Sequence, residues 1–146
     1  MTKQRNAMFP GSFDPIHSGH INIIKRCSKL FDKVYVAVSS NWYKKGASSL
    51  MTRFEKTKLE INKLHLKNVE VVVNKGLTVD FAKKHNVSFI IRSIRDSKDA
   101  KYEIDMAQVN HYLDNKIETI LMLPQHELVN LSSTAIRQLN DVKKAK

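Results

Sequence analysis

The apolar residues along the chain follow two alternating patterns. Short runs rich in β-branched residues, too short to form helices, predict strands. These runs cover residues 6–9, 34–38, 69–73, 88–91 and 118–123. Between them, apolar residues recur at the three- and four-residue spacing that places them on one face of a helix. The segments with this spacing are residues 18–31, 49–64, 78–85, 99–113 and a last helix from Ser132 or Ser133 through Leu139.

The order of these segments predicts the fold class. Strands that are almost continuously apolar are buried on both faces, as in a parallel sheet with helices on either side. We therefore expect one domain over residues 1–146, with a doubly wound, Rossmann-like α/β fold and a five-stranded parallel sheet. In such sheets the ligand crevice lies beyond the carboxyl ends of the strands. Here that edge would be formed by residues 11–20, 39–45, 92–95 and 124–134.

The loop after the first strand carries the most informative residues. Residues 10–20 read Pro-Gly-Ser-Phe-Asp-Pro-Ile-His-Ser-Gly-His. Gly11 allows a turn and a close approach of a ligand, and Ser18 is expected to cap the helix that follows. His17 and His20 then stand near the free N–H groups of a helix amino terminus, which favours phosphate. Two ordinary surface histidines are the alternative, but the preceding strand and turn favour phosphate chemistry.

Two overlapping motifs in this loop resemble known enzymes. Residues 17–20, His-Ser-Gly-His, are similar to the His-x-Gly-His signature of the nucleotidyltransferase superfamily. Residues 10–15, so close to the amino terminus, resemble the phosphopantetheine adenylyltransferases. His17 is also similar to the first histidine of the cytidylyltransferases and the nicotinamide-mononucleotide adenylyltransferases. This loop alone therefore leaves the branch of the superfamily open.

A second motif favours one branch. Residues 90–96, followed by Tyr102 and Glu103, resemble the Ile-Arg-Gly-Leu-Arg segment of the phosphopantetheine adenylyltransferases and their Tyr-Glu pair on a helix. Arg92 and Arg95 would present planar guanidinium groups suited to phosphate oxygens. Without the family resemblance, surface arginines balanced by neighbouring aspartates would be an equally good interpretation.

The resemblance implies roles for residues all along the predicted ligand edge. It implies catalysis by His20, Lys44 and Arg92. The acceptor would contact Ser12, Lys44, Leu77, Thr78 and Arg92. ATP would contact Ser12, Phe13, His17, His20, Ser93, Ile94, Arg95, Glu103, Leu128, Val129, Asn130, Leu131, Ser132, Ser133 and Thr134. Five positions depart from the family pattern: Ser12 and His17 stand where threonine is frequent, Thr78 replaces an apolar residue, Ser93 a glycine and Leu128 a tryptophan.

The reaction implied by the resemblance is transfer of AMP from ATP to 4′-phosphopantetheine, which gives dephospho-coenzyme A and pyrophosphate. The phosphate of the acceptor is already ionised at neutral pH, so the attack needs no general base. Mg²⁺ is the implied cofactor, held mainly by phosphate oxygens and water, and we expect no metal site built from protein side chains. A homohexamer and feedback by coenzyme A are implied by the resemblance alone.

Net charge and cysteine content narrow the class of partner and the cellular compartment. The net charge is +11, from 25 Lys+Arg against 14 Asp+Glu, which favours an anionic partner. A basic nucleic-acid-binding module is the alternative of another class, but we find no RNA-binding signature or recognition helix, and anionic small substrates explain the charge more simply. The single cysteine, Cys27, excludes an internal disulfide and favours a cytoplasmic location. No apolar run approaches the ~20 residues that span a bilayer, so we expect no membrane partner. Without a nucleic-acid-binding signature we expect no nucleic acid partner either.

Overall fold

The computed structural model describes residues 3–40, 48–125 and 133–145. Strands and helices alternate along these residues, as the sequence predicts. The strands are β1 (Asn6–Gly11), β2 (Lys33–Ser39), β3 (Val69–Asn74), β4 (Phe89–Ser93) and β5 (Glu118–Met122). The helices are α1 (Ser18–Leu30), α2 (Leu50–Asn62), α3 (Thr78–Lys84), α4 (Ser97–Leu113) and α5 (Ser133–Lys144).

The five strands of the described residues form one parallel sheet in the order β3-β2-β1-β4-β5. β1 is central and pairs with β2 along its whole length, from Asn6 opposite Lys33 to Gly11 opposite Val38. β2 and β3 lie in succession on one side of β1, and β4 and β5 lie in succession on its other side. The predicted Rossmann-like α/β fold is therefore confirmed, and the topological switch point lies between β1 and β4.

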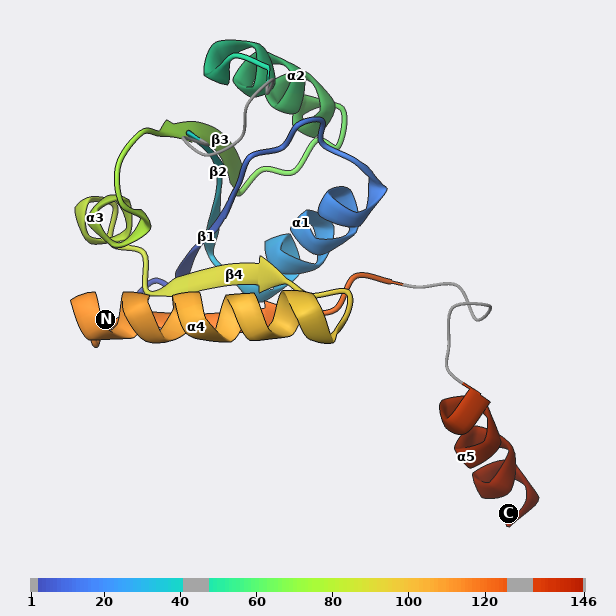
Figure 1. Ribbon diagram of the computed structural model, residues 1–146. Helices are drawn as coiled ribbons and strands as arrows, with labels where there is room; N and C mark the ends of the chain where they lie inside the picture. The colour runs from blue at the N-terminus through green and yellow to red at the C-terminus, as the bar shows by residue number, and fades with distance from the viewer. Residues whose placement is uncertain (1–2, 41–47, 126–132, 146) are drawn as a thin grey trace.

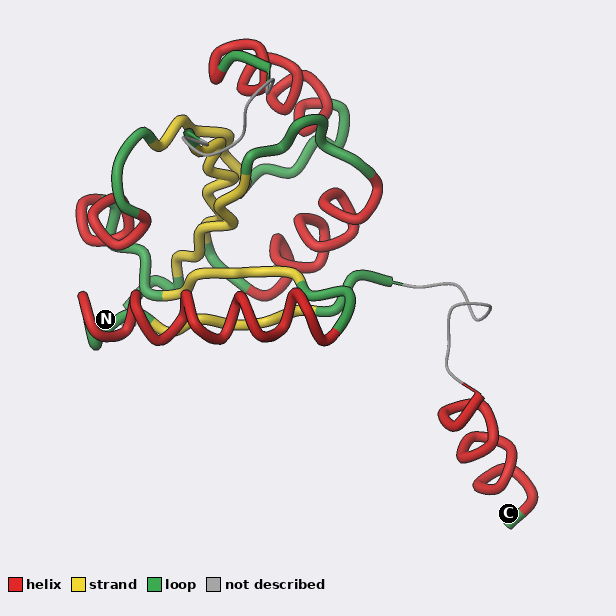
Figure 2. Tube along the Cα trace, viewed as in Figure 1, coloured by secondary structure: helices red, strands yellow, loops and turns green. Residues whose placement is uncertain are grey.

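Helices cover both faces of this sheet (Figure 1). Successive side chains of a strand point to opposite faces, so in β1 Phe9 packs into one apolar cluster and Met8 into another. The first cluster includes Ile24 of α1 and Ile61 of α2, and the second includes Ala82 of α3. α1 and α2 thus cover one face, and α3 covers the other together with α4 (Figure 2). This burial on two sides explains why the strands are nearly continuous apolar runs.

Each helix differs from its predicted bounds by at least one residue, and α4 and α5 show why. α4 begins at Ser97 rather than Asp99, because Asp96 caps it and accepts a hydrogen bond from the Asp99 N–H at 2.8 Å. α5 continues to Lys144 rather than ending at Leu139. Two lysines in its last turn interact favourably with the carboxyl end of the helix dipole. Figure 1 shows α5 standing apart from the sheet and from the helices that cover it.

The carboxyl ends of the strands share one edge of the sheet, because every pairing is parallel. Gly11 of β1, Ser39 of β2 and Ser93 of β4 end there. The predicted ligand edge is therefore present in the described part of the chain. Within that part, no helix is long and apolar enough to cross a membrane.

Candidate active site

A crevice of about 320 Å³ opens at this carboxyl edge. The structure brings four of the predicted site residues into its lining: Ser12, Thr78, Arg92 and Glu103. These side chains come from the loop after β1, from α3, from β4 and from α4, so four separate segments meet at one cavity. The cavity lies at the topological switch point, which is where ligands of doubly wound sheets bind.

The amino end of α1 is closed by two histidines that cap the helix reciprocally. His17, rather than Ser18 as predicted, is the N-cap residue, and its Nδ1 accepts a hydrogen bond from the Gly19 N–H at 3.1 Å. His20 Nδ1 in turn accepts a hydrogen bond from the His17 N–H at 3.1 Å. The two rings stack with their centroids 3.8 Å apart. Gly19 permits this arrangement, because a Cβ at that position would lie 3.0 Å from His17 Cε1.

His20 is neutral at physiological pH and carries its proton on Nε2. Burial lowers its pKa to about 4, with further contributions from His17 and from the positive charges of Arg92 and Arg95. A neutral imidazole that accepts at Nδ1 is protonated at Nε2. His20 therefore offers a hydrogen-bond donor beside the amino end of α1.

The Phe13 ring packs between His20 and Gly11, and Gly11 lines the crevice. The Phe13 ring is 2% exposed, lies 4.8 Å from the His20 ring and meets the Phe9 ring edge-on at 5.5 Å. Its backbone has a φ of 47°, in the left-handed region that residues other than glycine seldom adopt. Gly11 makes room for the ring, because a Cβ there would lie 3.2 Å from it. The Phe13 side chain thus belongs to the core, which leaves only its main chain for the predicted contact with ATP.

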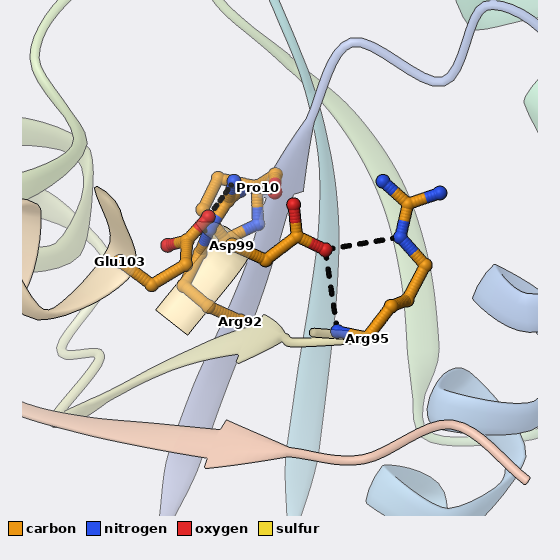
Figure 3. Close-up of polar contacts among 5 residues, drawn as sticks. All are labelled: Pro10, Arg92, Arg95, Asp99 and Glu103. Carbon is orange, nitrogen blue, oxygen red and sulfur yellow. Dashed lines mark hydrogen bonds and ion pairs between the residues drawn. The ribbon is translucent and has the colours of Figure 1, made fainter. Parts of the chain in front are cut away.

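Arg92 and Glu103 form a bidentate ion pair in the crevice wall (Figure 3). Nε and Nη2 of Arg92 lie 2.8 and 2.7 Å from the two Glu103 carboxylate oxygens, and Nη1 donates to the Pro10 carbonyl. The Arg92 side chain is 28% exposed, whereas that of Glu103 is 6% exposed. Glu103 was predicted to contact ATP, but its side chain instead holds Arg92. A guanidinium has five N–H donors, so two of those on Arg92 have no partner among the described residues.

Arg95 points away from this pair and forms a surface ion pair with Asp99 (Figure 3). The Arg95 Nε lies 3.0 Å from Asp99 Oδ2, and the Arg95 side chain is 66% exposed. The hydrogen bond from Arg95 lowers the pKa of the Asp99 carboxyl. The interpretation as a surface arginine balanced by a neighbouring aspartate therefore holds for Arg95 as the structure stands. Exposed pairs contribute at most about 1 kcal/mol, so the pairing with Asp99 holds Arg95 only weakly.

Four other predicted residues border the crevice or stand apart from it. Leu77 is 57% exposed at the N-cap position of α3, next to the lining residue Thr78. Ser93 is the last residue of β4. The N–H of Ile94 donates to the Met122 carbonyl at 3.0 Å, which continues the contact between β4 and β5. Thr134 lies in the first turn of α5, which stands apart from the sheet (Figure 1) and contributes no residue to the crevice lining.

The other predicted contacts lie mostly outside the described residues. These are Lys44, Leu128, Val129, Asn130, Leu131 and Ser132. Ser133 is the first residue of α5. Ser12 and Arg92 therefore share the crevice lining, whereas Phe13, His17 and His20 are not among the residues that line it.

A buried arginine of α2, Arg53, was missed by the sequence reasoning. It is 4% exposed and lies directly behind the crevice, where it donates to the carbonyls of Ser12 and Ser39. Charged residues in helices are mostly on the surface, and backbone acceptors leave no signature in a sequence. The one available signal was its spacing from Thr57 and Ile61, which are the other buried residues of α2.

Metal-binding groups are sparse in the described part of the chain. No group of three or more His, Cys, Asp or Glu side chains there could hold a metal ion. Glu103 is the one carboxylate among the described lining residues, and both of its oxygens accept from Arg92. The described residues therefore do not fit a Mg²⁺ ion held by protein side chains.

The fold and this site define a class of protein, and comparison with known sequences agrees. The chain matches the model of the cytidylyltransferase-like family over residues 8–139, so it is a nucleotidyltransferase of that class. It is 43% identical over 133 residues to the phosphopantetheine adenylyltransferase of Clostridium botulinum (strain Alaska E43 / Type E3), covering 91% of this chain and 82% of the relative. It is 44% identical over 135 residues to the enzyme of the same name from strain Hall, covering 92% and 81%. The chain belongs to the phosphopantetheine adenylyltransferase family.

Solved structures confirm the fold. The nicotinic acid mononucleotide adenylyltransferase of Plasmodium falciparum, complexed with NaAD, superposes with a TM-score of 0.60 at 16% identity, covering 97% of this chain and 90% of the other. A lipopolysaccharide core biosynthesis protein from Thermoplasma volcanium superposes with a TM-score of 0.57 at 19% identity, covering 86% and 99%. At these identities the likeness supports the Rossmann-like architecture alone.

Proposed function

We propose that this enzyme transfers the adenylyl group of ATP to the phosphate of 4′-phosphopantetheine and releases dephospho-coenzyme A and pyrophosphate. Membership of the family supports this choice of substrates. The observation that carries the chemistry is the state of His20, whose Nδ1 is occupied by the His17 N–H and whose Nε2 is left as a donor. A neutral donor at a helix amino terminus suits an anion whose charge changes during reaction.

The reaction is a direct in-line displacement. An oxygen of the acceptor phosphate attacks the α-phosphorus of ATP, a new P–O bond forms, and the bond to the β-phosphate oxygen breaks so that pyrophosphate leaves with its electron pair. The attacking oxygen is already ionised, so no residue has to remove a proton. His20 Nε2 donates to the α-phosphate as charge develops on it, and the Ser12 hydroxyl binds beside the point of transfer. The enzyme acts by positioning and by electrostatic stabilisation.

Arg92 holds the acceptor phosphate in this proposal. Glu103 and the Pro10 carbonyl fix the plane of its guanidinium, and two N–H groups remain for phosphate oxygens. Lys44, outside the described residues, would share this role and also contact the phosphate in transfer. Leu77 and Thr78 would contact the pantetheine arm, and Thr78 is in the crevice lining.

The contacts to ATP are proposed from the family resemblance. The triphosphate and adenosine would meet the α1 amino end through Phe13, His17 and His20. They would also meet residues 93–95 after β4 and residues 128–134. Mg²⁺ would enter with the triphosphate as its counter-ion, because the described side chains form no cage for it. We also expect a homohexamer and binding of coenzyme A as a feedback ligand, which sedimentation and inhibition measurements would test.

The proposal is tested by incubating the protein with ATP, Mg²⁺ and 4′-phosphopantetheine and measuring dephospho-coenzyme A and pyrophosphate by mass spectrometry. Parallel reactions replace the acceptor with nicotinamide mononucleotide, or ATP with CTP. We expect product from the first mixture and little from the others. Turnover of nicotinamide mononucleotide in preference to phosphopantetheine would place the chain in another branch. Tight, steeply salt-dependent DNA or RNA binding without any turnover would indicate a nucleic-acid-binding module instead.

A further inference from the structure

Arg53 has an unusual environment for a buried charge. Its side chain donates from Nη1 to the carbonyls of Ser12 at 2.7 Å and Ser39 at 2.8 Å, and from Nε to the carbonyl of Ser48 at 3.0 Å. A buried guanidinium normally faces a carboxylate, because burying an unpaired charge costs free energy. The described residues give Arg53 backbone carbonyls and no carboxylate partner. An ordinary structural ion pair therefore does not account for this arginine.

The three carbonyls belong to three separate segments of the site. Ser12 lies in the loop between β1 and α1, Ser39 ends β2, and Ser48 precedes the Ser49 cap of α2. Ser12 and Ser39 both line the crevice. Because one nitrogen donates to both of these, the planar guanidinium sets the spacing between the loop after β1 and the end of the neighbouring strand.

The Ser12 carbonyl is also next to Phe13, whose ring packs against His20. It belongs to the peptide group that links Ser12 to Phe13, and Phe13 has the left-handed φ of 47°. The Phe13 ring lies 4.8 Å from the His20 ring. Arg53 is thus connected through one peptide group and one aromatic ring to the proposed catalytic donor, although it does not line the crevice itself.

We infer that Arg53 is a positioning residue for adenylyl transfer, which holds Ser12 and, through Phe13, His20 in their reactive arrangement. The inference rests on the proposed function for its kinetic consequence, but its structural part concerns this chain alone. Substitution of Arg53 should lower kcat more than it raises the KM for either substrate, because the residue acts on the groups proposed to contact the α-phosphate in transfer and does not itself contact either substrate.

The test uses Arg53→Met, which keeps the apolar stem, and Arg53→Lys, which keeps the charge but not the planar fork. Lys56→Met is the matched control, since Lys56 is an exposed cation on the same helix. The imidazole resonances of His20, assigned by their loss in His20→Asn, report the position of the ring without any substrate. The kinetic arm compares the effect of Arg53→Met in wild-type and His20→Asn backgrounds.

We expect the His20 resonances to move in folded Arg53→Met and to stay in place in Lys56→Met. We expect kcat to fall about tenfold or more in Arg53→Met, partial recovery in Arg53→Lys, and a much smaller fall in the His20→Asn background. Unmoved His20 resonances in a folded variant, or equal effects in the two backgrounds, would overturn the inference. If Arg53→Met does not fold, the test is whether the His20 resonances move in Arg53→Lys. A wild type inactive on phosphopantetheine would refute the proposed function, while the resonances would still decide the role of Arg53.

Discussion

The donor at His20 can be removed while its capping role is kept. In His20→Asn, the side-chain oxygen can occupy the place of Nδ1 and accept the His17 N–H, which now lies 3.1 Å from that nitrogen. No group replaces the Nε2 donor. In His20→Gln the amide nitrogen can instead reach the place of Nε2, while the acceptor for His17 is lost. The two variants therefore separate stabilisation of the helix from stabilisation of the transition state.

The size of each effect follows from these contacts. Loss of one preorganised donor to a developing anion costs on the order of 3 kcal/mol, which is about a hundredfold in kcat. Loss of a helix cap costs about 1 kcal/mol of folding free energy. We expect His20→Asn to lose about a hundredfold or more in kcat with nearly wild-type stability. His20→Gln should keep more activity than His20→Asn and lose about 1 kcal/mol of stability. His20→Ala should lose both.

The assay is single-turnover formation of dephospho-coenzyme A, with urea unfolding measured on the same preparations. Single-turnover rates report the chemical step without product release. Wild-type-like rates in folded His20→Asn would refute the role of Nε2. A rate lost equally in the Asn and Gln variants would show that the whole imidazole, and not one nitrogen, is required.

Three further perturbations test other parts of the site. Gly19→Ala places a methyl group 3.0 Å from His17 Cε1; we expect a lower kcat with little change in melting temperature, because the gain in helix propensity of about 1 kcal/mol offsets the weakened cap. Glu103→Gln leaves Arg92 without its carboxylate, and urea unfolding should show a loss of about 2 kcal/mol; an unchanged midpoint would contradict the buried pair. The His20 pKa is lowered to about 4 from 6.5, so the unfolded state gains a proton first as pH falls. Stability that is complete above pH 6.5 should therefore drop by about 1 to 2 kcal/mol towards pH 4, after allowance for solvent screening, and His20→Asn should lack this component.

Periodicity was sufficient to predict the architecture, because both faces of the sheet are covered. Burial on two sides makes each strand a short apolar run, and the helices between them show one apolar face each. Because all the strands are parallel, their carboxyl ends must lie at the same edge of the sheet. This is why Ser12 and Arg92, eighty positions apart, could be predicted to share a crevice before the structure was known.

The hydrogen-bond and ion-pair partners of the site residues were harder to predict than the places of these residues in the fold. His17 replaced Ser18 as the cap because an imidazole nitrogen can accept the same hydrogen bond as a hydroxyl, and the order of residues does not reveal which one does. Arg92 and Glu103 were both assigned to ligands, whereas a strand and a helix packed together let them bind each other. Spacing along the chain does not show that such residues face one another.

The role of Arg53 could not have been predicted from sequence patterns. Its acceptors are main-chain carbonyls, which every residue possesses, and two of them lie 41 and 14 positions away along the chain. Sequence patterns describe which side chains face the core, but not which backbone groups meet there. A buried arginine of this kind becomes visible only when the loops around it are folded.

In the proposed reaction, one bound nucleotide contacts the amino end of α1 and the Arg92 crevice at the same time. A crystal structure of the protein with dephospho-coenzyme A, the product that carries the transferred phosphate, tests this most directly. We predict the adenylyl phosphate within hydrogen-bond distance of His20 Nε2, with Arg92 facing the phosphate that came from the acceptor. Product bound away from His20, or along a surface that excludes Arg92, would contradict the account.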